Sequence, residues 1–165
     1  MPSAATGPRR VLFVCLGNIC RSAMAEGIFQ HKIAAAGLAG SLSCDSAGFD
    51  RWTPGWAADE RAVATAREHG IQVATTARQV RANDYETFDL ILAMDRSNLR
   101  SLQRGCPTHL RRKLHMMREY DHPPAPDGEI PDPYHGSMAD FELVFEILDR
   151  CTDSLIARHT ETTTP

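Results

Sequence analysis

Long apolar runs are absent from this sequence of 165 residues, and none approaches the about 20 residues that a membrane-spanning helix needs. The first ten residues contain two arginines but no apolar core of a signal peptide. An excess of basic charge is absent as well, since the formal net charge is -3. Nucleic-acid binding usually needs a basic face, so we expect neither a membrane nor a nucleic acid as a partner.

Cysteine is sparse. The five cysteines are too few for a secreted disulfide framework, and their odd number leaves one over. We therefore expect a reducing compartment, the cytoplasm. No CxxC pair, HExxH motif or His/Cys cluster has zinc-ligand spacing, and neither G-x-x-x-x-G-K-S/T nor G-x-G-x-x-G occurs. The sequence thus predicts no metal ion, no cofactor and no nucleotide site.

Length and composition predict one globular domain. The chain is 42% hydrophobic and 24% charged, as in ordinary soluble proteins, and it is long enough to bury a single core. No internal repeat is visible. We expect a monomer with a flexible leader over residues 1–9, a single domain over residues 10–159 and a disordered tail over residues 160–165.

Short apolar segments alternate with stretches of helical periodicity. Strands are expected at Arg10–Cys15, Ser41–Ser46, Leu90–Met94 and Lys113–Met117, and helices at Ser22–Ala36, Ala57–His69, Ser97–Arg104 and Ser137–Ala157. Gly37 and Gly70 follow two of these helices, where a C-cap needs a left-handed residue. The pattern predicts an α/β, flavodoxin-like doubly wound sheet of four parallel strands with helices on both faces. Its site is expected at the carboxyl ends of the strands.

The first strand delivers Cys15 into a short loop that Arg21 closes at the start of a helix. The N–H groups of such a loop converge on an anion, and the helix dipole adds to the attraction. The planar fork of Arg21 binds two phosphate oxygens, and the same positive field favours a nucleophilic thiolate. The spacing C-x5-R also occurs by chance, and a strand-end cysteine is often a small buried hydrophobe. Gly17, Asn18 and Ser22 suit a tight loop and favour the nucleophile.

Several separated segments then occur in the order and spacing of one known family. They are Val11–Glu26, Asp45–Gly48, Ala77–Val80, Met94–Leu99, Asp132-Pro133-Tyr134 with Gly136, and the pair Asp140-Phe141. In these segments the chain, from about Arg10 to about Leu155, resembles the low-molecular-weight protein tyrosine phosphatases. Several motifs in the right order are much more specific than one.

The resemblance implies an enzyme that hydrolyses phosphotyrosine in proteins through a cysteinyl-phosphate, without a cofactor. It makes Cys15 the nucleophile, Arg21 the phosphate-binding arginine and Asp132 the acid for the leaving oxygen, although an Asp-Pro pair is also an ordinary turn former. The expected phosphate-binding residues are Leu16, Gly17, Asn18, Ile19, Cys20 and Ser22; the aromatic walls are Trp52 and Tyr134; and Ser46 and Asp95 support the site. Trp56 has two interpretations, a further wall or a cap on the core edge.

The sequence departs from the family pattern at three positions. Ala23 stands where many members have proline, so the helix start is less rigidly fixed. Thr75 replaces a histidine that supports the phosphate loop, so the polar contacts behind the loop must differ. His135 replaces the second tyrosine of the common Asp-Pro-Tyr-Tyr, which bears on substrate preference. None of these changes removes a group that the chemistry needs.

Alternative functions make different demands on the sequence. An arsenate reductase needs two further cysteines close together, whereas Cys44, Cys106 and Cys151 are isolated. A protein-arginine phosphatase tends to carry threonine where this chain has Ile19. A module that only binds phosphotyrosine should lack Cys15 or Asp132.

The sequence also raises a redox hypothesis, a disulfide between Cys15 and Cys20 that protects the oxidised nucleophile. In the alternative, Cys20 merely packs beneath the loop.

Overall fold

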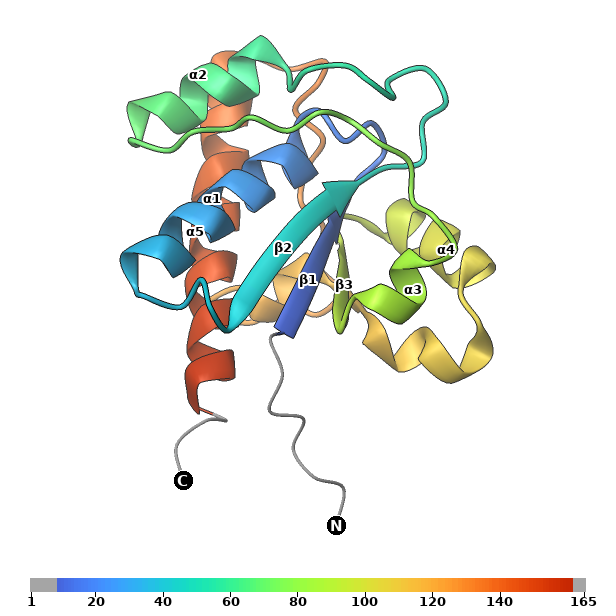
Figure 1. Ribbon diagram of the computed structural model, residues 1–165. Coiled ribbons are helices and arrows are strands. Elements are labelled where there is room, and N and C mark those ends of the chain that lie inside the picture. Colours follow the sequence, from blue (N-terminus) through green and yellow to red (C-terminus); the bar gives the residue numbers. More distant parts are fainter. Residues whose placement is uncertain (1–8, 162–165) are drawn as a thin grey trace.

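A computed structural model describes residues 9–161. At its centre is one four-stranded sheet in which all strands are parallel, in the order β2-β1-β3-β4 (Figure 1). The strands are β1 (Arg9–Val14), β2 (Leu42–Ala47), β3 (Leu90–Ala93) and β4 (Leu114–Met116). The predicted doubly wound sheet is confirmed.

Helices cover both faces of this sheet, as predicted. On one face lie α1 (Arg21–Ala35), α2 (Glu60–Glu68) and α5 (Met138–Glu161), and on the other lie α3 (Asp84–Thr87) and α4 (Arg96–Gly105) (Figure 1). Two 3-10 helices, η1 (Thr108–Lys113) and η2 (Met117–Tyr120), flank β4. The sequence pattern does not predict α3, η1 or η2, because such short helices show no clear periodicity. Among residues 9–161, no helix is both long and apolar enough to cross a membrane.

The structure moves two predicted boundaries. Arg9 belongs to β1 rather than to a leader, because its N–H donates to the carbonyl of Ser41 at 2.9 Å and extends the pairing with β2. Helix α5 continues through Thr160, whose hydroxyl donates to the carbonyl of Ala157 at 2.9 Å and satisfies an acceptor of the last turn. The rest of the predicted leader and tail, residues 1–8 and 162–165, lies outside the described residues.

Strand β1 separates two halves of the core. Val11 and Phe13 pack with residues of α1 and α5, whereas Leu12 and Val14 pack with residues of α3 and α4. All four side chains are fully buried, which explains why the strand is a continuous apolar run instead of an alternating one. Burial of each such side chain contributes roughly 1.5–3 kcal/mol relative to exposure.

The strand order places a topological switch point next to β1. The strand that follows β1 in the sequence lies on one side of it, and β3 lies on the other. Ligands of open α/β sheets bind at such a switch, beyond the carboxyl ends of the strands. The segments that leave β1 and β3 meet there, where the N–H of Met94 donates to the carbonyl of Val14 at 3.1 Å.

Candidate active site

The loop after β1 is anchored from outside through its carbonyl groups. The Leu16 carbonyl accepts from the N–H groups of Phe49 at 2.8 Å and Asp50 at 2.9 Å. The Gly17 carbonyl accepts from the Thr53 hydroxyl, and the Ile19 carbonyl accepts from the Asp59 N–H, both at 2.8 Å. In a planar trans peptide the N–H points away from the carbonyl. The N–H groups that follow these three carbonyls, those of residues 17, 18 and 20, therefore face the inside of the loop and form an anion-binding nest.

Two residues permit this tight curl. Asn18 has a φ of 56°, in the left-handed region that asparagine tolerates better than most side chains. Gly48, at the end of β2, lies so close to the loop that a Cβ there would stand 2.5 Å from the Leu16 oxygen. Any larger residue at position 48 would push the loop out of shape.

The sulfur of Cys15 is buried among hydrogen-bond donors. Its Sγ lies 3.0 Å from the Ser22 hydroxyl and accepts from the Asn18 N–H at 3.3 Å. Ser22 Oγ accepts from Asn18 Nδ2 at 2.8 Å, which leaves the hydroxyl hydrogen to point at the sulfur. The N-terminus of α1 also faces the loop and has no acidic residue in its first turn. These positive partial charges suit a thiolate.

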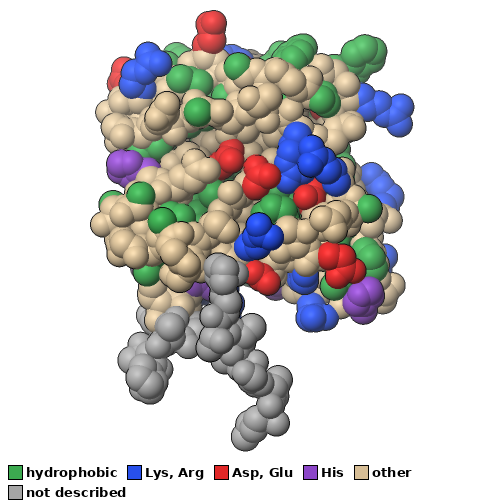
Figure 2. Space-filling view, viewed as in Figure 1, with side chains coloured by type: hydrophobic (Ala, Val, Ile, Leu, Met, Phe, Trp, Pro, Cys, Tyr) green, Lys and Arg blue, Asp and Glu red, His purple; other side chains and the backbone are tan. Residues whose placement is uncertain are grey.

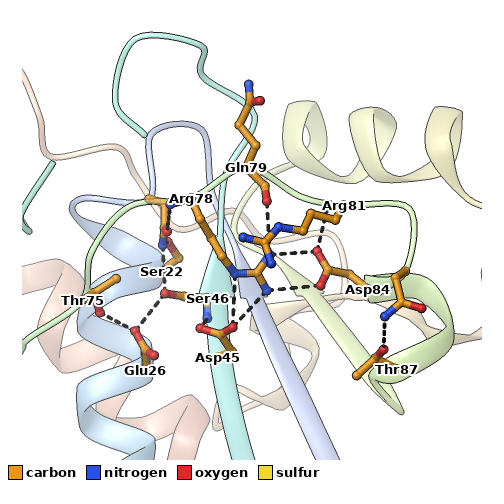
Figure 3. A network of polar contacts seen from close by, with 12 residues as sticks. Ser22, Glu26, Asp45, Ser46, Thr75, Arg78, Gln79, Arg81, Asp84 and Thr87 are labelled. Atoms are coloured by element: carbon orange, nitrogen blue, oxygen red, sulfur yellow. Dashed lines mark hydrogen bonds and ion pairs between the residues drawn. The ribbon is translucent and has the colours of Figure 1, made fainter. Parts of the chain in front are cut away.

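A chain of polar contacts extends behind the loop (Figure 3). Asn18 Nδ2 also donates to Ser46 Oγ at 2.8 Å, and the Ser46 hydroxyl donates to Glu26 Oε2 at 2.9 Å. The Thr75 hydroxyl donates to the same carboxylate oxygen. Burial raises the pKa of Glu26 above its ordinary value, although both hydroxyls oppose that shift. At the position of the family histidine, Thr75 thus closes the network through Glu26, a residue that sequence reasoning did not single out.

Arg78 fixes the remaining polar atom of Asn18. Its backbone N–H donates to Asn18 Oδ1 at 3.0 Å, so both ends of the amide are engaged. The Arg78 guanidinium pairs with Asp45 and Asp84, each at 3.0 Å (Figure 3). Figure 2 shows acidic and basic side chains intermingled over the middle of the face that it views. The hydroxyl groups of Ser22 and Ser46 and the N–H of Arg78 set the orientation of Asn18, so this orientation depends on elements far apart in the sequence.

Arg21 is buried and held by one of its terminal nitrogens. Nη1 donates to Asp95 Oδ2 at 2.8 Å and to the Ile130 carbonyl at 2.9 Å. The other oxygen of Asp95 accepts from the Asn98 N–H at 2.7 Å and so caps α4. Nη2 lies 3.6 Å from Asp132 Oδ2. The first residue of α1, the N-cap of α4 and the loop before α5 thus meet at one guanidinium.

These groups border a cavity of about 290 Å³. The residues that line it are Cys15, Leu16, Gly17, Ile19, Cys20, Arg21, Asp50, Trp52, Thr53, Trp56, Asp132, Tyr134 and His135. Four expected site residues lie behind the cavity: Asn18, Ser22, Ser46 and Asp95.

The aromatic side chains form the outer part of this cavity. Trp52 is 83% exposed and Tyr134 is 41% exposed, as suits walls at an opening. Trp56 is 51% exposed and lines the cavity, which favours its interpretation as a further wall. Sequence reasoning did not predict Asp50 or Thr53 as lining residues. The sequence feature that indicates a role for both residues is their position beside Trp52, in a loop that contains proline and glycine.

The cysteines bear on the arsenate reductase alternative. All five lie within the described residues and are free, and only Cys15 and Cys20 line the cavity. Cys44 donates weakly to the Glu26 carbonyl at 3.7 Å, behind the loop. Cys106 packs on the α4 face of the sheet and Cys151 on the α5 face. No pair of further thiols therefore stands ready at the cavity to resolve an arsenate adduct.

Comparison with known sequences gives matches over nearly the whole chain. Residues 10–163 match the family described as low molecular weight phosphotyrosine protein phosphatase. A protein of that name from Sus scrofa is 40% identical over 152 residues, covering 91% of this chain and 95% of the relative. A low molecular weight protein-tyrosine-phosphatase from Streptomyces coelicolor is 40% identical over 152 residues, covering 90% of this chain and 92% of that relative.

Solved structures share the fold. A protein tyrosine phosphatase from Entamoeba histolytica, with Hepes in its active site, has a TM-score of 0.89 at 35% identity, covering 94% of this chain and 99% of that chain. Wzb from Vibrio vulnificus, in complex with benzylphosphonate, has a TM-score of 0.80 at 26% identity, covering 92% of this chain and 99% of that chain. The chain therefore belongs to the low molecular weight phosphotyrosine protein phosphatase family.

Proposed function

We propose that the protein hydrolyses phosphotyrosine in proteins in two steps centred on Cys15. The thiolate attacks phosphorus, the bond to the phenolic oxygen breaks, and Asp132 gives its proton to that oxygen. Water then attacks the cysteinyl-phosphate, Asp132 takes a proton from the water, and inorganic phosphate leaves with the thiolate restored. The convergence of Cys15, Arg21 and Asp132 on one cavity is the observation that carries this proposal.

Charge on the transferred phosphoryl group is the main quantity to be stabilised. The inward N–H groups of residues 17, 18 and 20 supply donors that need no rearrangement during the reaction. Arg21 adds a full positive charge from a buried position. Because Asp95 and the Ile130 carbonyl hold Nη1, the guanidinium can present Nη2, which lies 3.6 Å from Asp132 at the cavity, to the phosphate oxygens.

The cavity walls support an aryl substrate. Trp52 and Tyr134 can enclose a flat ring, and the branched Ile19 of the phosphate loop also lines the cavity. The benzylphosphonate complex of the Vibrio vulnificus relative supports an aromatic group beside the phosphate site. Tyrosine-phosphorylated proteins are therefore the proposed substrates. The five free thiols support the cytoplasm as the place of action.

Replacing the proposed acid should separate substrates by their leaving groups. We expect Asp132→Asn to lower kcat/KM for phenyl phosphate or phosphotyrosine by roughly 10²-fold or more, because the departing phenolate then receives no proton. The loss should be clearly smaller for para-nitrophenyl phosphate, whose leaving group needs little protonation. Steady-state kinetics with both substrates measure the difference.

The matched control for this experiment is Asp127→Asn, at an exposed carboxylate. It should leave both values of kcat/KM unchanged. Equal losses for the two leaving groups in Asp132→Asn would mean that Asp132 positions the loop instead of protonating the phenolate.

We further propose that the nucleophile is protected against oxidation by Cys20. Peroxide converts the Cys15 thiolate to a sulfenic acid, and the Cys20 thiol then displaces water to form a disulfide. Both thiols line the same cavity. Burial, reinforced by Asp59, raises the pKa of the Cys20 thiol well above its ordinary value. Because the attacking form is the thiolate, we expect disulfide formation to accelerate as the pH rises.

Recovery after peroxide tests this protection. Wild-type enzyme treated with peroxide should regain activity in dithiothreitol, whereas Cys20→Ser should recover poorly because its sulfenic acid is oxidised further. Cys106→Ser, on the opposite face of the sheet, is the control and should behave as wild type. Equal recovery of wild type and Cys20→Ser, or the absence of a Cys15–Cys20 peptide in mass spectra, would rule the protection out.

A further inference from the structure

Arg61, in the first turn of α2, joins three separate parts of the molecule. Its Nη2 donates to the Tyr134 carbonyl at 2.9 Å, and its Nη1 donates to the Gly136 carbonyl at 3.4 Å. Its guanidinium also lies 4.6 Å from the ring centroid of the fully buried Phe141 of α5. The side chain therefore holds two backbone carbonyls of the loop that carries Asp132.

The other end of this bridge is the phosphate loop. Asp59 binds the Arg61 guanidinium through both carboxylate oxygens, at 3.0 Å to Nε and 2.9 Å to Nη2. These bonds are the main reason that the pKa of Asp59 lies below its ordinary value, so the carboxylate stays charged. The Asp59 N–H donates to the Ile19 carbonyl at 2.8 Å. An unbroken path thus runs from Ile19 through Asp59 and Arg61 to the backbone of residues 134 and 136.

Asp132 itself has few contacts that fix its position. Its side chain is 48% exposed and its polar contacts are the Tyr134 N–H at 3.2 Å and Arg21 at 3.6 Å. The first contact is local, so the carboxyl group moves with the turn over residues 132–134. That turn is held by Arg61 at the Tyr134 carbonyl. A proton donor displaced by about 1 Å can lose on the order of 10²-fold in rate.

We propose that Arg61 is a positioning residue, which fixes the acid loop relative to the phosphate loop so that Asp132 reaches the leaving oxygen. This inference rests on the proposed role of Asp132 as the acid. Arg61 does not itself line the cavity, and its contacts with the site run through the acid loop: the carbonyls of Tyr134 and Gly136, and the Tyr134 ring, whose centroid lies 5.6 Å from the guanidinium. Its removal should therefore impair proton donation more than attack on phosphorus.

Arg61→Met is the informative variant, because it removes all donors but keeps an unbranched apolar stem against Phe141. We expect kcat/KM for phenyl phosphate to fall about tenfold, and that for para-nitrophenyl phosphate to fall less than about threefold. The ratio of the two values is the readout, since any unfolded fraction of the variant cancels from it. Arg67→Met, at an exposed position in the last turn of the same helix, should leave the ratio unchanged.

A double-mutant cycle with Asp132→Asn completes the test. If Arg61 acts through Asp132, Arg61→Met should change kcat/KM for phenyl phosphate less than about twofold in the Asp132→Asn background. An equal loss in both backgrounds, or an unchanged leaving-group ratio in Arg61→Met alone, would overturn the proposal while leaving Asp132 as the acid. If Asp132→Asn itself shows no leaving-group dependence, both the acid assignment and the role of Arg61 fail.

Discussion

Cys15→Ser is expected to lower kcat for aryl phosphates by at least about 10⁴-fold, to the background rate. A serine hydroxyl fits between the Ser22 hydroxyl and the Asn18 N–H, but it does not ionise near neutral pH. The loop carbonyls that are anchored from outside do not involve the side chain of residue 15. The variant should therefore keep its fold and bind inorganic phosphate about as tightly as the wild type.

Two measurements separate loss of the nucleophile from loss of the site. Acid quenching of a single turnover with radiolabelled substrate should trap a phosphoenzyme in the wild type and none in Cys15→Ser. Titration calorimetry with inorganic phosphate should give similar dissociation constants for both proteins. Cys44→Ser, behind the loop, is the matched control and should retain turnover. More than a small fraction of wild-type kcat in Cys15→Ser would exclude Cys15 as the nucleophile.

The sheet could be predicted from the sequence because its signals are local. The strands β1 and β3 contain short apolar runs, and the turns after α1 and α2 contain Gly37 and Gly70, which both adopt positive φ. The sequence does not predict α3, since a single turn around Asp84 and Tyr85 has too few residues to show a period. Tertiary packing holds it in place: Tyr85 is buried against Leu102 of α4, and its hydroxyl donates to the Leu102 carbonyl at 3.1 Å.

The residues of the site likewise fall into those with a local signal in the sequence and those that meet only after folding. Cys15 and Arg21 could be predicted from residue chemistry, because nucleophile, loop and helix start are contiguous in the sequence. Asp132 could not, since it approaches Arg21 only after folding, and its assignment came from the resemblance to the family. The positions of Glu26 and Arg61 also escaped prediction. Glu26 accepts from hydroxyl groups of distant segments. Arg61 binds the nearby Asp59, but its role depends on backbone carbonyls of a distant loop, which carry no signature in the sequence.

Arg21→Lys should reduce kcat/KM for aryl phosphates by about 10³-fold, although the charge is conserved. The guanidinium binds Asp95 and the Ile130 carbonyl with Nη1 while presenting its other edge to the cavity. A lysine ammonium is a single point, so it can remain with Asp95 or turn to the phosphate but cannot span both. We therefore expect weaker phosphate binding together with the loss of turnover.

Arg104→Lys, at an exposed position in the last turn of α4, tests whether the guanidinium geometry matters only at position 21. It should leave both kcat/KM and the phosphate dissociation constant unchanged. Near-normal kcat/KM in Arg21→Lys would show that a point charge suffices and that two-point recognition of the phosphate is wrong. A large loss with unaltered phosphate binding would instead place the role of the fork in the transition state, where charge spreads over the equatorial oxygens.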